Sequence, residues 1–247
     1  MGQFPPPPYP GQSFSLFEAL LPYIEQDNIQ AQLILNKLNH FGEYADSQYF
    51  NCIGPNSVGA QIIKILTCPA DSGLPGPPIS TYTTHGVTYY FGMTSYGGCA
   101  GTISTYWQDE TKDGIFYINS KTRIGDITDG TSNTLFFGER YHLDPIFDLI
   151  YQPLGEFGGW AWANANSTED YLLSTRVPIN YKVPQGTTSN PGFFYSDRRL
   201  CAFGSGHTAG ANFAYADGSV HFLSDGISLA VLQALGTRAG GEAVALP

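Results

Sequence analysis

The chain has 247 residues and a formal net charge of −10, and only 13% of its residues are charged. An acidic balance argues against a nucleic-acid-binding protein, because phosphate contacts need clustered Lys and Arg. No apolar run is long enough to span a membrane, and no signal peptide is visible. This composition is typical of a soluble extracytoplasmic protein, or of one that holds hard cations.

A proline-rich leader occupies residues 1–12, and its abrupt start suggests that another segment precedes it. Residues 13–247 follow and are expected to form a single domain. Ser15 and Glu18 predict a capping box that opens a helix, and Pro22 should kink or restart that helix. A loosely helical pattern then continues through four apolar residues, Ile24, Ile29, Leu33 and Leu38.

The middle of the chain changes from a helical to a strand-like pattern. Residues 57–66 predict a second short helix, which ends before Cys68. Runs of Tyr, Thr, Phe and Ile then alternate with glycine, which is typical of strands. We expect these strands at residues 87–91, 115–118 and 134–137.

Residues 142–200 are harder to assign, because Pro, Asn, Ser and Tyr dominate them. We expect long ordered loops or an insertion here, with Trp160 and Trp162 as anchors. Whether this region forms a separate lobe is open at this point.

The C-terminal part of the chain gives the strongest local signal. Asp217 and Gly218 stand between alternating apolar residues and predict a β-hairpin over residues 211–223. A closing helix is expected over residues 228–235, with Gly236 as its stop. The whole pattern predicts an α+β fold, in which an antiparallel sheet packs on short helices and Asp-Gly hairpins join the strands.

Four cysteines allow two interpretations. An even number is compatible with two disulfides in an oxidising compartment, and three pairings are possible. The alternative is four buried thiols that pack as small apolar side chains. Their spacing does not match a Cys/His zinc motif. The four residues are Cys52, Cys68, Cys99 and Cys201.

Carboxylates and histidines gather at the ends of the predicted strands. Loop ends of an antiparallel sheet can converge, so these side chains could bind a divalent cation. Oxygen ligands alone would favour Ca²⁺, and added histidine would favour Zn²⁺ or Mn²⁺. The simpler interpretation is that each Asp-Gly is only a turn, that His207 pins the hairpin, and that Glu139 pairs with Arg140. The expected metal ligands are Asp129, Glu139, His207 and Asp217, with His142 in reserve; Glu139 and His207 are also the candidate catalytic groups.

Two aromatic clusters could serve as sugar-binding platforms. They are formed by residues 89–91 and by Trp160 with Trp162. Core packing or a subunit contact is the favoured interpretation, since aromatic side chains dominate both.

His207 is followed by nine residues and then by Asp217-Gly218, within the segment 203–220. This pattern resembles the C-terminal signature of the bacterial prepilin-type, His-x9-Asp-Gly family, which is pseudopilin-like and mostly of unknown function. Other segments resemble the family in the same order along the chain. They are 20–26, 66–71, 95–101, 113–116, 127–134 with 138–140, and 235–242.

The resemblance implies a pilin-like head that is exported and displayed outside the inner membrane, in the periplasm, on the cell surface or secreted. Family members usually begin with a prepilin cleavage site and a long apolar helix, and neither is present here. The resemblance supplies no catalytic mechanism.

Three functions remain open from the sequence. The first is a structural or interaction module with protein partners in a secretion or surface assembly, with at most a structural Ca²⁺. The second is a metal-dependent hydrolase of phosphoesters or other small-molecule esters, in which the ion would lower the pKa of a bound water. The third and weakest is a glycan-binding module.

Overall fold

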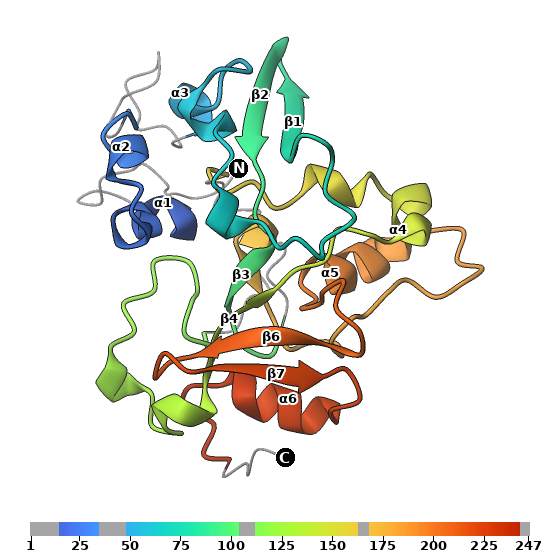
Figure 1. Cartoon of the computed structure of the whole chain (residues 1–247). Coiled ribbons are helices and arrows are strands. Elements are labelled where there is room, and N and C mark those ends of the chain that lie inside the picture. The colour runs from blue at the N-terminus through green and yellow to red at the C-terminus, as the bar shows by residue number, and fades with distance from the viewer. Residues whose placement is uncertain (1–14, 35–47, 104–111, 163–167, 243–247) are drawn as a thin grey trace.

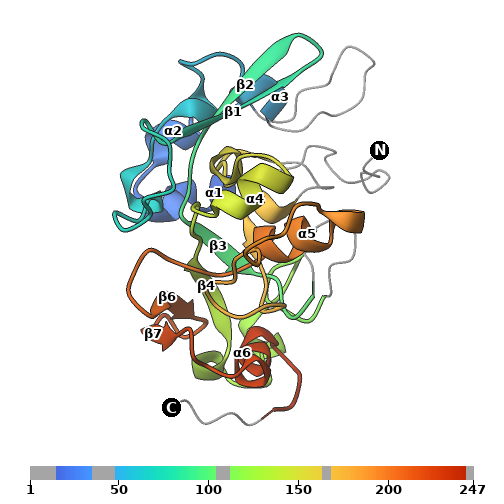
Figure 2. The same cartoon turned by 90° about the vertical axis from the view of Figure 1, so that its right-hand side faces the viewer.

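The computed structural model describes residues 15–34, 48–103, 112–162 and 168–242. The predicted leader and Leu38 therefore lie outside the described residues. Short helices and two sheets make up the fold, which confirms the α+β class. Figure 1 and Figure 2 show the β1–β2 hairpin at one end of the molecule and α6 at the other, with β3 and β4 between them.

Helices in the described part of the chain are short. The α-helices are α1 Leu16–Leu20, α2 Asp27–Gln30, α3 Gln48–Asn51, α4 Pro145–Ile150, α5 Phe194–Leu200 and α6 Leu229–Gly236. The 3-10 helices are η1 Leu21–Ile24, η2 Val58–Ala60, η3 Lys64–Leu66, η4 Ile124–Asp126, η5 Thr131–Asn133, η6 Leu154–Glu156, η7 Thr168–Asp170 and η8 Pro191–Phe193. The strands are β1 Ile79–Thr84, β2 Val87–Gly92, β3 Tyr96–Cys99, β4 Leu135–Glu139, β5 Leu172–Leu173, β6 Gly210–Tyr215 and β7 Val220–Ser224.

The main sheet has the strand order β5-β3-β4-β6-β7. Its pairs are antiparallel except β3–β5, which is parallel, so the expected antiparallel sheet is in fact mixed. Strand β4 lies in the centre, and its last residue, Glu139, pairs with Tyr96 of β3. The Glu139 carboxylate thus stands at the end of a strand that is held on both sides.

The capping box at the start of α1 is confirmed. The Ser15 hydroxyl accepts a hydrogen bond from the Glu18 N–H, and the Glu18 carboxylate accepts one from the Ser15 N–H. Pro22 lies in the first turn of η1. Its lack of a backbone N–H has no cost there, because the N–H groups of a first turn have no partner within the helix.

The helix predicted over residues 57–66 is wrong, because tertiary contacts divide it. Gly59 lies so close to the Cys52 side chain that a Cβ would be 2.3 Å from its sulfur. Gln61 is extended, and its carbonyl accepts a hydrogen bond from the indole of Trp160 at 2.9 Å. Only the short turns η2 and η3 remain.

The strand predicted over residues 115–118 is also wrong. The Phe116 N–H donates a hydrogen bond to the Cys99 carbonyl. In the described part of the chain, residues 115–118 do not form a strand in either sheet. The Phe116 ring instead stacks on Phe136, with 5.0 Å between centroids. Aromatic enrichment here reflects side-chain packing and not strand pairing.

The strands predicted over 87–91 and 134–137 are confirmed as β2 and β4, and the Asp-Gly hairpin is confirmed as β6–β7. Gly218 has φ of 86°, which the tight turn requires. The closing helix is confirmed as α6, which has the expected length but lies one residue later, so that Ser228 is its N-cap and Gly236 its last residue. Leu232 and Leu235 of α6 are fully buried in a core cluster with the sheet.

Residues 142–200 hold more regular structure than expected. Helices α4 and α5 contact each other, and Phe147 and Leu200 share a small core cluster. Trp160 is fully buried and Trp162 packs against the same cluster as Phe91. No helix in the described part of the chain is long and apolar enough to cross a membrane.

Candidate metal centre

Three segments that are far apart in the sequence bring three polar side chains to one point. Cys68 follows η3, Glu139 ends β4, and His207 lies in the loop before β6. The Cys68 Sγ is 3.4 Å from Glu139 Oε1 and 3.5 Å from His207 Nε2, and His207 Nε2 is 3.2 Å from Glu139 Oε1. We call Cys68, Glu139 and His207 the ligand trio.

Glu139 is fixed in place by the neighbouring strand. Its side chain is nearly fully buried, and Oε2 accepts hydrogen bonds from the Asn212 backbone N–H at 2.6 Å and from the Asn212 side-chain amide at 3.2 Å. The other carboxylate oxygen, Oε1, is left to face Cys68 and His207. The carboxylate is therefore oriented before any ligand binds.

Negatively charged carboxylates lie in and around the ligand trio. Burial raises the pKa of the Cys68 thiol; a hydrogen bond from the Ala70 backbone N–H opposes this, and the Glu139 and Asp71 carboxylates add to it. Burial also raises the pKa of Tyr96 to about 12, and the same two carboxylates again contribute. The negative charge of the carboxylates raises the pKa of nearby acidic groups, and a bound cation would offset that charge.

His207 closes the group from the solvent side. Its side chain is 38% exposed, whereas that of Glu139 is only 3% exposed. The loop is held by Ser205, whose hydroxyl accepts from the His207 N–H and donates to the Gly210 carbonyl. Gly206 lets this loop approach the Cys68 segment, because a Cβ at this position would lie 1.8 Å from the Ala70 carbonyl oxygen.

The geometry of the trio differs from that of a nucleophilic relay. In a Cys-His-carboxylate relay the thiol and the carboxylate contact different nitrogens of the imidazole. Here Cys68 and Glu139 both approach Nε2. A tetrahedral Zn²⁺ with bonds of about 2.3 Å to S and about 2.0 Å to N and O spaces its ligands by about 3.5 Å for S···N and S···O, and about 3.3 Å for N···O. The observed distances of 3.5, 3.4 and 3.2 Å match one face of that tetrahedron.

Asp217, an expected ligand, lies in the turn of the β6–β7 hairpin. Its carboxylate accepts from the backbone N–H and hydroxyl of Ser219, and these hydrogen bonds lower the pKa of Asp217. Strand β6 separates Asp217 from His207, and its six residues span roughly 20 Å. The nine-residue spacing that links the two residues in sequence thus places them at opposite ends of a strand.

Asp129 is also outside the trio. Its carboxylate accepts hydrogen bonds from the Gly240 N–H at 2.6 Å and the Gly241 N–H at 2.9 Å. It therefore anchors the segment that follows α6. The structure brings together only Glu139 and His207 of the four expected ligands, and Cys68 takes the third place.

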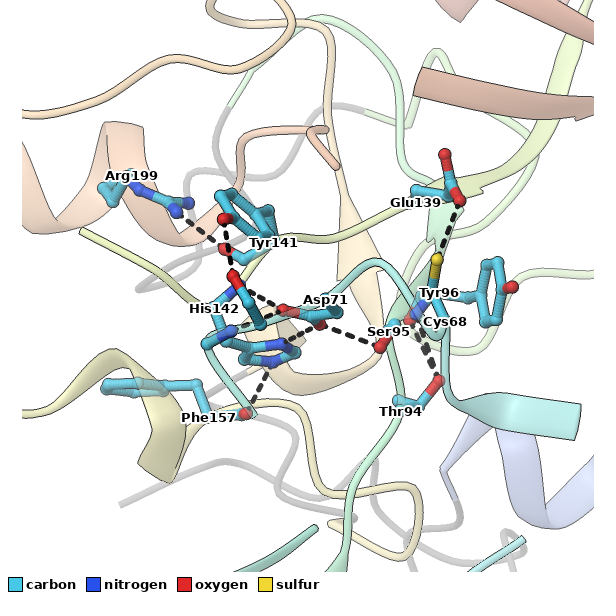
Figure 3. A network of polar contacts seen from close by, with 12 residues as sticks. Cys68, Asp71, Thr94, Ser95, Tyr96, Glu139, Tyr141, His142, Phe157 and Arg199 are labelled. Atoms are coloured by element: carbon cyan, nitrogen blue, oxygen red, sulfur yellow. Dashed lines mark hydrogen bonds and ion pairs between the residues drawn. The ribbon is translucent and has the colours of Figure 1, made fainter. Parts of the chain in front are cut away.

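His142, the reserve ligand, is paired elsewhere. Its Nδ1 lies 2.6 Å from Asp71 Oδ2, and its Nε2 lies 3.1 Å from the Phe157 carbonyl oxygen (Figure 3). Burial lowers the pKa of His142, and the contact with Asp71 opposes this shift. Burial alone would raise the pKa of Asp71, but the contacts with His142 outweigh it and lower the pKa.

Cys68 is the candidate ligand that the sequence alone did not indicate. All four cysteines are free and buried, so the disulfide alternative does not apply; Cys52, Cys99 and Cys201 are packed thiols, whereas Cys68 faces Glu139 and His207. No short spacing links Cys68 to Glu139 or His207, and only the fold joins them. Trp160, proposed as part of a sugar platform, is fully buried and therefore cannot stack on a glycan.

Comparison with known proteins places the chain in a family but does not provide an activity. No curated protein and no solved structure matches it. Residues 1–229 match the profile of a family described as "Protein of unknown function (DUF1559)". With more than nine-tenths of its length matched, the chain belongs to the DUF1559 family.

Proposed function

We propose that this chain is the structural or interaction head of an exported, pseudopilin-like protein, and that the ligand trio holds a divalent metal ion within it. The observation that carries the proposal is the convergence of Cys68, Glu139 and His207 within hydrogen-bond distances of one another. The pseudopilin-like class rests on the ordered set of sequence segments, above all His207-x9-Asp217-Gly218.

The chemistry of the trio favours Zn²⁺ over Ca²⁺. Calcium takes six to eight oxygen ligands, whereas a thiolate, an imidazole and a carboxylate are the usual zinc donors. Manganese prefers oxygen donors and is a weaker match for Cys68. The ion would tie the loop before β6 to the end of β4 and to the segment after η3. The loop and β4 are already joined by a hydrogen bond from the Gly204 N–H to the Glu139 carbonyl at 2.8 Å.

The direct test is a metal analysis of protein purified without added chelator, followed by thermal unfolding with and without Zn²⁺. We expect about one zinc per chain and a melting temperature that rises with zinc concentration. His207→Ala should abolish both effects, and His221→Ala is the matched control, because His221 is an exposed histidine on β7. Equal zinc binding by wild type and His207→Ala would contradict the assignment.

Export and partners need a test of their own. Fractionation of the source cells with an antibody against this domain should recover the protein outside the cytoplasm, in the periplasm, on the surface or in the medium. Cross-linking in intact cells should then capture envelope or secretion-assembly proteins. Recovery in the cytoplasm alone would remove the pseudopilin-like function while leaving the metal site intact.

A metal-dependent hydrolase is the second candidate, because the trio provides only three protein ligands. A fourth position on the side of the half-exposed His207 would be open for water, as in catalytic zinc sites. Glu139 then acts as a ligand, since its buried carboxylate is already engaged by Asn212. Zinc-dependent turnover of aryl esters or phosphoesters that Cys68→Ser and His207→Ala both abolish would support the enzyme; zinc binding without turnover would support the structural role.

A further inference from the structure

The segments that carry Cys68 and Glu139 make a second contact three residues further along the chain. Asp71 lies three residues after Cys68, and His142 lies three residues after Glu139. Cys68 faces Glu139, and Asp71 faces His142, so the two segments are joined by two polar contacts (Figure 3). The second contact is much more deeply buried from solvent than His207 is, with side-chain exposures of 0% for His142 and 1% for Asp71.

Further hydrogen bonds fasten the two segments to each other and to β3. The His142 backbone N–H donates to Asp71 Oδ1 at 3.1 Å, so Asp71 holds both the ring and the main chain of His142. The Ser95 hydroxyl donates to Asp71 Oδ2 at 2.8 Å, and the Ser95 carbonyl accepts from the Arg140 N–H at 2.8 Å. Ser95 therefore contacts both segments at once.

The third ligand depends on the same arrangement. Gly206, next to His207, packs against the Ala70 carbonyl of one segment and lies near the Tyr141 ring of the other. The Ser72 and Tyr141 hydroxyls are 3.0 Å apart and close the contact between the two segments. The position of His207 is thus set by residues that Asp71 and His142 hold in place.

We propose that the buried Asp71–His142 pair is a positioning device for the metal centre, which sets the spacing of the Cys68 and Glu139 ligand atoms. This inference rests on the proposed metal site and adds two residues to it that do not touch the ion. Residues that orient metal ligands typically change metal affinity by about 10- to 100-fold when they are removed.

The test uses Co²⁺ as a probe for the zinc site in the purified full chain. Thiolate-bound tetrahedral Co²⁺ gives characteristic visible bands, so it reports the ligand geometry as well as the affinity. We expect Asp71→Asn and His142→Gln to weaken Co²⁺ and Zn²⁺ binding by about 10- to 100-fold and to shift or weaken these bands.

Glu18→Gln is the matched control, because Glu18 is another buried carboxylate that accepts a backbone hydrogen bond, and it lies in α1, outside the three ligand segments. Glutamine can also complete a capping box, so this variant should leave the bands and the affinity unchanged. Unchanged bands and affinity in Asp71→Asn would overturn the positioning role, and so would an equal loss of affinity in Glu18→Gln.

A milder variant covers the case in which Asp71→Asn does not fold. Ser95→Ala removes one hydrogen bond to Asp71 and should lower Co²⁺ affinity several-fold, while Ser196→Ala, an equally buried serine in α5, should leave it unchanged. Wild-type protein that binds neither Co²⁺ nor Zn²⁺ would overturn the metal site itself. Wild-type binding with equal binding by Ser95→Ala and by any folded Asp71 variant would overturn only the positioning role.

Discussion

Two polar clusters lie close together in this molecule, and they satisfy their hydrogen bonds in different ways. In the ligand trio, three side chains from three segments meet at one point, and two of them approach the same nitrogen of His207. In a second set of contacts, which we call the buried scaffold, each carboxylate contacts one basic side chain: Asp71 contacts His142 and Asp144 contacts Arg199. One-to-one pairs hold neighbouring segments together, whereas a convergent group with one open side is suited to an added cation.

The largest effect should come from breaking a scaffold pair. Asp144 accepts hydrogen bonds from Arg199, from the Phe147 N–H at the start of α4 and from the Val183 N–H. Asp144→Ala leaves Arg199 buried without its carboxylate, which typically costs about 3–5 kcal/mol. Urea denaturation should show this loss. Asp148→Ala, which removes an exposed carboxylate from the same helix, should change stability far less.

Asp170 should make the stability of the protein depend on pH. Burial raises the pKa of Asp170 to about 6, against the opposing effect of Arg140 and of hydrogen bonds from Gly159 and Gly158. The folded protein then binds more protons than the unfolded chain between about pH 4 and pH 6, so stability falls as pH rises through this window. The full effect is at most about 3 kcal/mol.

Asp170→Asn should flatten this pH dependence, because the amide oxygen can still accept from the two glycines but no longer ionises. Denaturation midpoints at several pH values from 4 to 7 would measure it. A wild-type midpoint that rises between pH 4 and 6, and loses that rise in Asp170→Asn, would contradict the raised pKa.

A substitution at Gly206 would test whether the trio depends on the close approach of the His207 loop to the Ala70 backbone. A Cβ at this position would overlap the Ala70 carbonyl, so Gly206→Ala should push the His207 loop outward. We expect zinc affinity to fall by about tenfold, with a stability loss of about 1–3 kcal/mol from overpacking. Competition with a chromophoric chelator would measure the affinity. Gly125→Ala is the control, since nothing lies within 4 Å of its added Cβ.

The smallest effect should come from Asp217. Its exposed carboxylate only closes the hairpin turn through Ser219. Asp217→Ala should therefore lower the melting temperature slightly and leave zinc affinity unchanged. If zinc affinity instead fell as much as in His207→Ala, Asp217 would have to be restored as a ligand.

Local signals in the sequence were reliable where the physics is local. The Ser15–Glu18 capping box and the Asp217-Gly218 turn depend on residues a few positions apart, and both are present in the structure. The helix expected over 57–66 and the strand over 115–118 failed, because contacts with Trp160 and Phe136 from distant segments decide the conformation there.

The candidate metal centre shows the same limit. Glu139 and His207 could be nominated from their places at predicted strand ends, but Cys68 could not, since only the tertiary fold brings it to them. Asp217 was nominated by its fixed spacing from His207, and the length of β6 explains why that spacing separates the two. When a strand lies between two residues, a fixed spacing in the sequence means that they are far apart and not in contact.

The anchor formed by Asp129 bears on where this folding unit ends. The family match stops at residue 229, at the first residue of α6. Yet Leu232 and Leu235 are fully buried, and Asp129 binds the backbone of Gly240 and Gly241. A fragment that ended at residue 229 would expose apolar surface and lose the backbone partners of Asp129, so a minimal expression boundary should be drawn no earlier than Gly241.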